Sequence, residues 1–145
     1  MASPEQPGTT ETALEQPFER GDLYRVRAAV AAHASELGGS PMQVNYLVLI
    51  ASELVTNAIA YAGGHGTIRL WRADSQLHCE VSDDGPGIPN AQTQGLQQPP
   101  ASAQRGRGLW VARKLADGLE ITTGTSGATV TVTMRLEKAE PVRQR

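Results

Sequence analysis

The chain has 145 residues, 39% of them hydrophobic, which suits one compact domain with its own core. Thirteen Lys and Arg against fifteen Asp and Glu give a formal net charge of -2, without the basic excess expected of a nucleic-acid or membrane-surface binder. A single cysteine, Cys79, excludes an intrachain disulfide and favours a cytoplasmic protein. We see neither a signal-peptide pattern nor a stretch approaching a membrane span, and expect no membrane partner.

The N-terminal part of the chain predicts a flexible leader, an edge strand and a helix. Residues 1–13 are mostly polar and offer little to bury, so we expect them to be flexible. Residues 14–20 suit an edge strand. Asp22 is a residue type that caps helices, and the apolar spacing after it predicts a helix that ends at Gly38.

A second helix is predicted from Pro41, with Ser40 as its cap, to about Ala62. On it Glu53 and Asn57 lie four residues apart, so they project from one face, about 6 Å apart along the axis. A carboxylate beside an amide oxygen suits Mg²⁺. Taken alone, such a pair is more often part of a solvated helix face.

The rest of the chain alternates with a period of two in four segments and contains one further short helix. The predicted strands are 67–72, 76–83, 119–123 and 128–136, and the helix is 107–117. This pattern predicts an α+β fold of two layers, an antiparallel or mixed sheet covered on one face by helices. We expect the domain to cover 14–136, followed by a charged tail, 137–145.

Asp83 continues the inward row of the second strand, which predicts a partly buried carboxylate that needs a partner. Gly85 and Gly87 follow it and allow a ligand to approach the backbone. Such a carboxylate suits an amino donor such as the exocyclic nitrogen of adenine, and a plain turn fits equally well. The aperiodic, glutamine-rich residues 88–105 are typical of a lid, a binding loop or disorder.

The segment from Arg105 to Leu109 opens the short helix. Gly106 and Gly108 expose backbone amides at a helix N-terminus, and Arg105 and Arg107 add positive charge, a combination that binds phosphate. The segment is not a Walker A loop. In isolation it also fits a glycine-flanked helix start with surface arginines.

In this order the segments resemble the GHKL ATP-binding superfamily and, within it, the small anti-sigma-factor, serine-protein-kinase type. LVLIASELVTNAIAYAGG is similar to the N box, VSDDGPGIP to the G1 box, GRGLWVARKLADGLEI to the G2 box and TSGATVTV to the last glycine box. The matching stretch runs from about residue 22 to 136. One departure is Tyr61, where the family often has a histidine.

The resemblance implies a Bergerat ATP-binding fold and specific roles for the boxes. Glu53 would be the catalytic carboxylate, Asn57 the magnesium ligand and Asp83 the partner of adenine. Arg105 and Arg107 would stabilise the transferred phosphate. The further residues implied at the nucleotide are Gly85, Gly87, Ile88, Gly106, Gly108, Leu109 and Thr129.

The function implied by the resemblance is that of an anti-sigma factor that binds a sigma factor and phosphorylates a serine of a STAS-type antagonist with Mg-ATP. It allows a homodimer and implies no direct contact with nucleic acid. Two alternatives stay open, a nucleotide-gated binding module without turnover and, less favoured, the catalytic fragment of a sensor histidine kinase. The second lacks a preceding dimerisation helix pair with a phosphoacceptor histidine.

Overall fold

The computed structural model describes residues 10–88, 91, 95–96, 99 and 107–137. Within them the chain forms five strands and three helices. In chain order these are β1 (Thr10–Glu19), α1 (Leu23–Glu36), α2 (Pro41–Tyr61), β2 (His65–Ala73), β3 (Gln76–Asp83), α3 (Arg107–Leu115), β4 (Gly118–Gly124) and β5 (Gly127–Arg135).

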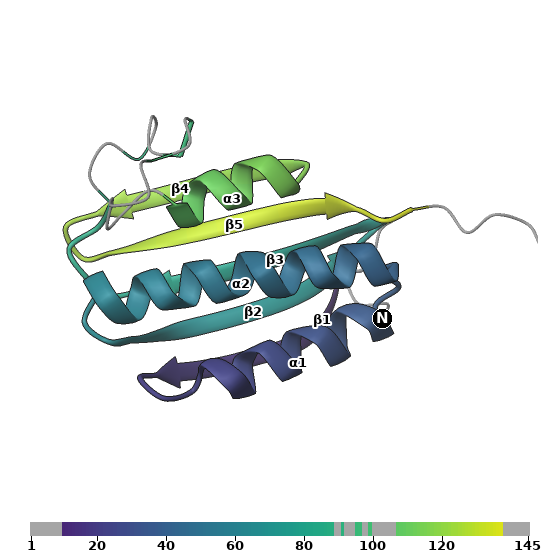
Figure 1. Cartoon of the computed structure of the whole chain (residues 1–145), viewed down its shortest axis with the longest axis horizontal. Helices are drawn as coiled ribbons and strands as arrows, with labels where there is room; N and C mark the ends of the chain where they lie inside the picture. Colours follow the sequence, from purple (N-terminus) through teal and green to yellow (C-terminus); the bar gives the residue numbers. More distant parts are fainter. Residues whose placement is uncertain (1–9, 89–90, 92–94, 97–98, 100–106, 138–145) are drawn as a thin grey trace, which may run out of the picture.

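The five strands form one sheet in the order β1-β2-β3-β5-β4, and all three helices lie on one of its faces (Figure 1). This confirms the predicted two-layer α+β architecture. The four strand pairs are all antiparallel, so the described sheet is not mixed. Order and layers together match the Bergerat fold.

The core lies between the sheet and the helices, and alternation along the strands builds it. Leu77, Cys79 and Val81 of β3 are at most 3% exposed, and each pairs with an equally inward residue of β5. Complete burial, with repulsion from the Glu80 carboxylate, raises the pKa of Cys79 to about 12. The thiol is therefore a core group, as predicted, and is protonated at neutral pH.

Helix α2 begins and ends where the sequence predicts. Ser40 and Gln43 form a capping box, in which the Ser40 hydroxyl accepts from the Gln43 amide and the Gln43 side chain accepts from the Ser40 amide. The helix ends before Gly63 and Gly64, which both have positive φ. Since its buried residues include Leu47, Ile50 and Leu54, α2 is the central helix of the layer.

Two expectations for the N-terminal region are wrong. Strand β1 begins at Thr10, so the predicted leader cannot extend to residue 13. Asp22 precedes α1 but makes no side-chain cap, because its φ of -95° and ψ of 3° are not the extended values of a capping residue. Its carboxylate instead accepts from the Glu19 amide at 2.9 Å and pairs with Arg25 at 3.2 Å.

The expectation that no segment approaches a membrane span also needs correction. Helix α2 is long and apolar enough to cross a membrane by length and composition. In this fold its apolar face packs on the sheet, with Leu47, Ile50 and Ala51 fully buried. The core helix of a soluble protein meets the same two criteria, so they do not by themselves indicate a membrane protein.

Candidate functional site

The structure brings the predicted residues of α2 and α3 together. Glu53 and Asn57 face the N-terminus of α3, where Gly108 is buried against both of them. A Cβ at Gly108 would lie 2.6 Å from Asn57 Nδ2 and 3.4 Å from Glu53 Cβ, so a larger residue would displace the Asn57 amide. The two helices therefore place a carboxylate, an amide and a helix N-terminus side by side.

Arg107 binds Glu53 through a bidentate ion pair at this junction. Its Nε donates to Oε1 at 3.2 Å and its Nη2 to Oε2 at 3.1 Å. The Glu53 side chain is 15% exposed and that of Arg107 is 72% exposed. Because most of the guanidinium lies in water, little free energy holds it there, and Arg107 can leave Glu53 for another anion.

Asp83 lies at the end of β3, where its Oδ1 accepts a hydrogen bond from the Gly85 amide at 2.8 Å. At the far end of the same loop the Ile88 amide donates to the Thr123 hydroxyl at 2.8 Å. Both ends of the segment 84–88 are thus tied to neighbouring strands. The hydrogen bond with the loop uses only one oxygen, Oδ1, of the Asp83 carboxylate.

A narrow cavity connects these parts. Its walls come from α2, β3, the 84–88 loop, α3 and β5: Leu54, Asn57, Ala58, Ala62, Val81, Asp83, Gly87, Ile88, Leu109 and Val130. The volume is about 30 Å³, comparable to one water molecule and far below the roughly 300 Å³ at which ligand pockets begin. A nucleotide base therefore requires the walls of this cavity to move apart.

Sequence reasoning missed most of the apolar wall of this cavity. Val81 and Val130 pair across β3 and β5 one alternation step from Asp83, and Ala58 of α2 is four residues before Ala62, which directly follows the helix. The period-two and helical patterns carried this information, because they already placed these residues inward. No motif pointed to Thr123, whose contact with Ile88 joins positions 35 residues apart.

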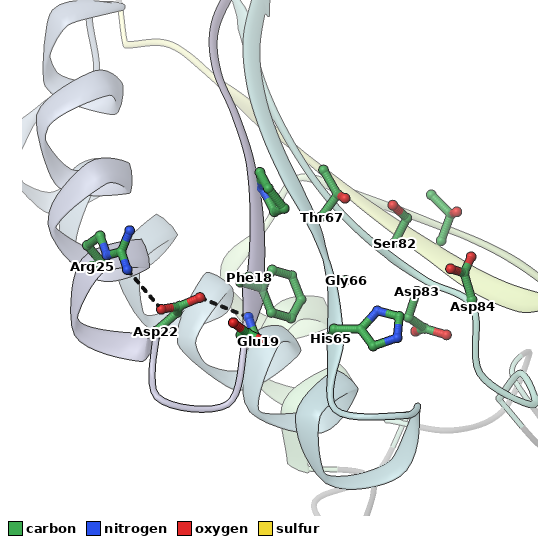
Figure 2. A pocket seen from close by; sticks show the side chains of 12 residues that line it. Phe18, Glu19, Asp22, Arg25, His65, Gly66, Thr67, Ser82, Asp83 and Asp84 are labelled. Atoms are coloured by element: carbon green, nitrogen blue, oxygen red, sulfur yellow. Dashed lines mark hydrogen bonds and ion pairs between the residues drawn. The ribbon is translucent and has the colours of Figure 1, made fainter.

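Thr129 is not part of this arrangement. Its neighbour Ala128 pairs with Asp83 and is 4% exposed, whereas Thr129 pairs with Ser82 on the other face of the sheet. There it lines an open cavity of about 710 Å³, which Figure 2 shows together with Thr67, Ser82 and Asp84. A base bound in the narrow cavity would therefore not contact Thr129, and the predicted contact of Thr129 with the nucleotide stays a prediction.

The larger cavity does not suit a nucleotide. Glu19, Asp22, Asp83 and Asp84 contribute carboxylates to its lining, and these would repel phosphates. It also lacks Glu53, Asn57 and the N-terminus of α3. We therefore place the candidate site in the narrow cavity, although it is the smaller of the two.

Arg105 and Gly106, together with most of the segment 88–105, lie outside the described residues. Ala91 is described, is 6% exposed, and accepts a hydrogen bond through its carbonyl oxygen from Arg113 of α3 at 3.2 Å. This contact joins the segment to α3. Tyr61 is half-buried in the last turn of α2.

Magnesium fits the donor set only as an ion shared with phosphate. No group of three or more His, Cys, Asp or Glu side chains among the described residues could hold a metal. Mg²⁺ typically keeps waters and phosphate oxygens and takes one or two protein ligands. Asn57, one helical turn from Glu53 and with its Nδ2 beside Gly108, could supply its amide oxygen as such a ligand.

Comparison with solved structures shows the same fold in several bacterial proteins. The RsbU and RsbW domains of Rv1364c from Mycobacterium tuberculosis are 22% identical with a TM-score of 0.62, covering 86% of this chain and 32% of that chain. The SiaB–SiaC complex from Pseudomonas aeruginosa is 11% identical with a TM-score of 0.61, covering 86% of this chain and 91% of that chain. The histidine kinase AdeS from Acinetobacter baumannii is 16% identical with a TM-score of 0.54, covering 86% and 68%.

This chain spans about a third of the mycobacterial protein, and at such identities the likeness shows the fold. No curated protein matches the sequence. A family model, the histidine kinase-like ATPase domain, matches residues 17–135 and so includes every described site residue. With its N, G1 and G2 boxes assembled around one cavity, the chain belongs to the histidine kinase-like ATPase domain family of the GHKL superfamily.

Proposed function

We propose that the protein is a cytoplasmic anti-sigma regulatory factor that binds a sigma factor and uses Mg-ATP to phosphorylate a serine of a STAS-type antagonist. Family membership supports nucleotide binding. The RsbW domain and the SiaB–SiaC complex among the similar structures support the regulatory class. The sigma factor, the antagonist and the serine are inferences beyond this support.

The observation that carries the proposal is the junction of Glu53, Asn57, Arg107 and Gly108. Phosphoryl transfer needs a group that orients or deprotonates the hydroxyl, a cation for the phosphates and positive charge at the transferred group. The junction supplies a carboxylate, a metal-ligating amide, a guanidinium and a helix N-terminus within one contact region. A structural helix contact would not require all four.

In the proposed reaction Asp83 accepts a hydrogen bond from the adenine amino group and the α3 N-terminus faces the phosphates. Asn57 would hold Mg²⁺, which neutralises charge on the phosphate oxygens when bound. Glu53 accepts the proton of the serine hydroxyl as the serine oxygen bonds to the γ-phosphorus. The bond from that phosphorus to the β,γ-bridging oxygen breaks, and ADP leaves with the electron pair.

Arg107 has two positions in this scheme. In the structure it neutralises Glu53, and both carboxylate oxygens are engaged. The γ-phosphate competes with Glu53 for the exposed guanidinium. When the guanidinium moves from Glu53 to the phosphate, Glu53 is free to accept a proton. Phosphate binding and exposure of the catalytic carboxylate are thereby linked.

Transfer of labelled phosphate from ATP to a co-purified antagonist tests the proposal. Glu53→Gln should lower transfer by roughly 10²-fold or more while ATP affinity stays within about threefold, because a positioned base acts mainly in the transition state. Glu120→Gln on β4, an exposed carboxylate away from the site, is the control and should transfer at the unmutated rate. Equal activity of Glu53→Gln and the unmutated protein would contradict the catalytic assignment.

The engagement of both Glu53 oxygens by Arg107 also favours a second candidate, a binding module in which the nucleotide gates partner exchange without turnover. In that case the unmutated protein binds Mg-ATP and its partner tightly and transfers no phosphate. A pull-down from the native cytosol with and without Mg-ATP identifies the partner and separates the candidates.

A further inference from the structure

The loop that forms one wall of the narrow cavity is tied down at two points by acceptors on two different strands. The Gly85 amide donates to Asp83 Oδ1 on β3, and the Ile88 amide donates to Thr123 Oγ1 on β4, each at 2.8 Å. Asp83 belongs to a recognised box. Thr123 lies in no motif and does not itself line the cavity.

The strand register explains why these two acceptors serve one loop. Ala128 of β5 pairs with Asp83 on one side and with Thr123 on the other. The three residues therefore form a row across the sheet on the face that carries the helices. The small side chain of Ala128 in the middle leaves both polar groups open toward the loop.

The loop also packs directly on the end of β4. Gly87 has a φ of +90°, and a Cβ there would lie 2.4 Å from the Gly124 carbonyl oxygen and 2.7 Å from Thr123 Oγ1. Gly87 and Ile88 both line the cavity, so the position of β4 determines where this wall stands. The hydrogen bond from Ile88 to Thr123 fixes the contact at its C-terminal end.

We propose that Thr123 is a positioning residue for the nucleotide base, acting through the Ile88 amide; this rests on the proposed nucleotide binding. Its hydroxyl sets the distance between the Ile88 wall and the Asp83 carboxylate. That distance decides whether a purine whose amino group donates to Asp83 also contacts the apolar wall. Thr123 thus contributes to the preference for adenine over guanine.

Four proteins test the assignment by calorimetry with ADP and GDP: the unmutated chain, Thr123→Val, Thr123→Ser and Thr122→Val. Valine keeps the shape of threonine and removes the acceptor, and serine restores it. Thr122 is the matched control, because it is an adjacent exposed threonine that pairs with Thr129 on the opposite face. Thermal unfolding of each variant checks that the fold is retained.

We expect Thr123→Val to raise the dissociation constant of ADP roughly 3- to 10-fold, the range for one lost hydrogen bond, and to reduce the ratio of ADP to GDP affinity. Thr123→Ser and Thr122→Val should stay within about twofold of the unmutated protein. Amide hydrogen exchange without nucleotide should show faster exchange at Ile88 in Thr123→Val only.

The outcomes separate this inference from the proposed function. If the unmutated protein binds no adenine nucleotide, nucleotide binding fails and the inference fails with it. If it binds ADP and Thr123→Val binds both nucleotides equally well, the inference alone is overturned. Faster exchange at Ile88 with unchanged ADP affinity likewise overturns it, because the hydrogen bond would then be structural without affecting the base.

Discussion

Asp83 and Asp84 are adjacent carboxylates with different surroundings. Asp83 accepts from the Gly85 amide and lines the narrow cavity, whereas Asp84 lines only the larger cavity. A hydrogen bond to an ionised acceptor is worth about 1.5–3 kcal/mol. Asp83→Asn should therefore weaken ADP binding roughly 10- to 100-fold and Asp84→Asn less than about twofold, measured by calorimetry. Equal losses would contradict the assignment of the base to Asp83.

On the other face of the sheet, the protonation of His78 makes the stability of the fold depend on pH. Its ring stacks on Trp71 at 5.2 Å, and its Nδ1 lies 3.1 Å from the Thr133 hydroxyl. Partial burial lowers the pKa of His78 below its ordinary value of 6.5. As the pH decreases below 6.5, His78 therefore takes up a proton in the unfolded chain before it does so in the folded chain. The free energy of unfolding decreases over this range, until the pH is below the pKa of His78 in the folded chain.

Removing the imidazole should remove that part of the pH dependence. We expect the free energy of unfolding of the unmutated protein to decrease from pH 7.5 to pH 5.5 more steeply than that of His78→Gln, measured by urea denaturation. Other titrating groups contribute equally to both proteins and cancel in the comparison. Parallel pH profiles would show that His78 titrates alike in the folded and unfolded chains.

At the scale of elements, Gln43 joins the start of α2 to the end of β5. It is 6% exposed, completes the capping box with Ser40, and donates through Nε2 to the Arg135 carbonyl oxygen. Gln43→Ala leaves the partly buried Ser40 amide and Arg135 carbonyl without this partner and should lower the free energy of unfolding by about 1–3 kcal/mol. Asn45→Ala, exposed on the same helix, should change it by less than about 0.5 kcal/mol. Urea denaturation measures both, and equal effects would contradict the linking role.

The sequence predicted the elements best where local chemistry decides them. The Ser40 cap and the glycines after Tyr61 predicted the start and the end of α2. Strict alternation predicted which residues of β3 and β5 face inward. Asp22 failed as a cap because the turn from Glu19 sets its backbone and draws its carboxylate to the Glu19 amide. Residue type alone does not define that geometry.

The site was predictable only in part for a related reason. The family resemblance named Thr129, while the alternation of β5 placed it on the outer face, and the structure agrees with the alternation. A family motif can be aligned one residue away from the equivalent position, whereas the alternation along β5 assigns each residue to one face of the sheet. The pairing of Arg107 with Glu53 and the contact of Ile88 with Thr123 depend on tertiary packing, so no local pattern specifies them.

At the scale of the whole molecule, the candidate site joins distant segments. Its walls come from α2, β3, α3 and β5, so a nucleotide bound there would contact both layers of the domain. A ligand that binds only the folded state raises its stability according to its concentration and affinity. Nucleotide binding should therefore stabilise the entire fold, beyond any local effect on the loop.

Thermal unfolding with and without Mg-ATP tests this central claim most directly. At 100 times the dissociation constant the ligand adds about 2.7 kcal/mol, which corresponds to a rise in Tm of roughly 5–10 °C for a domain of this size. Asn57→Ala, lacking the proposed magnesium ligand, should lose most of this rise when tested at the same Mg-ATP concentration. An unchanged Tm of the unmutated protein, or an equal rise in Asn57→Ala, would contradict a Mg-ATP site at the junction of α2 and α3.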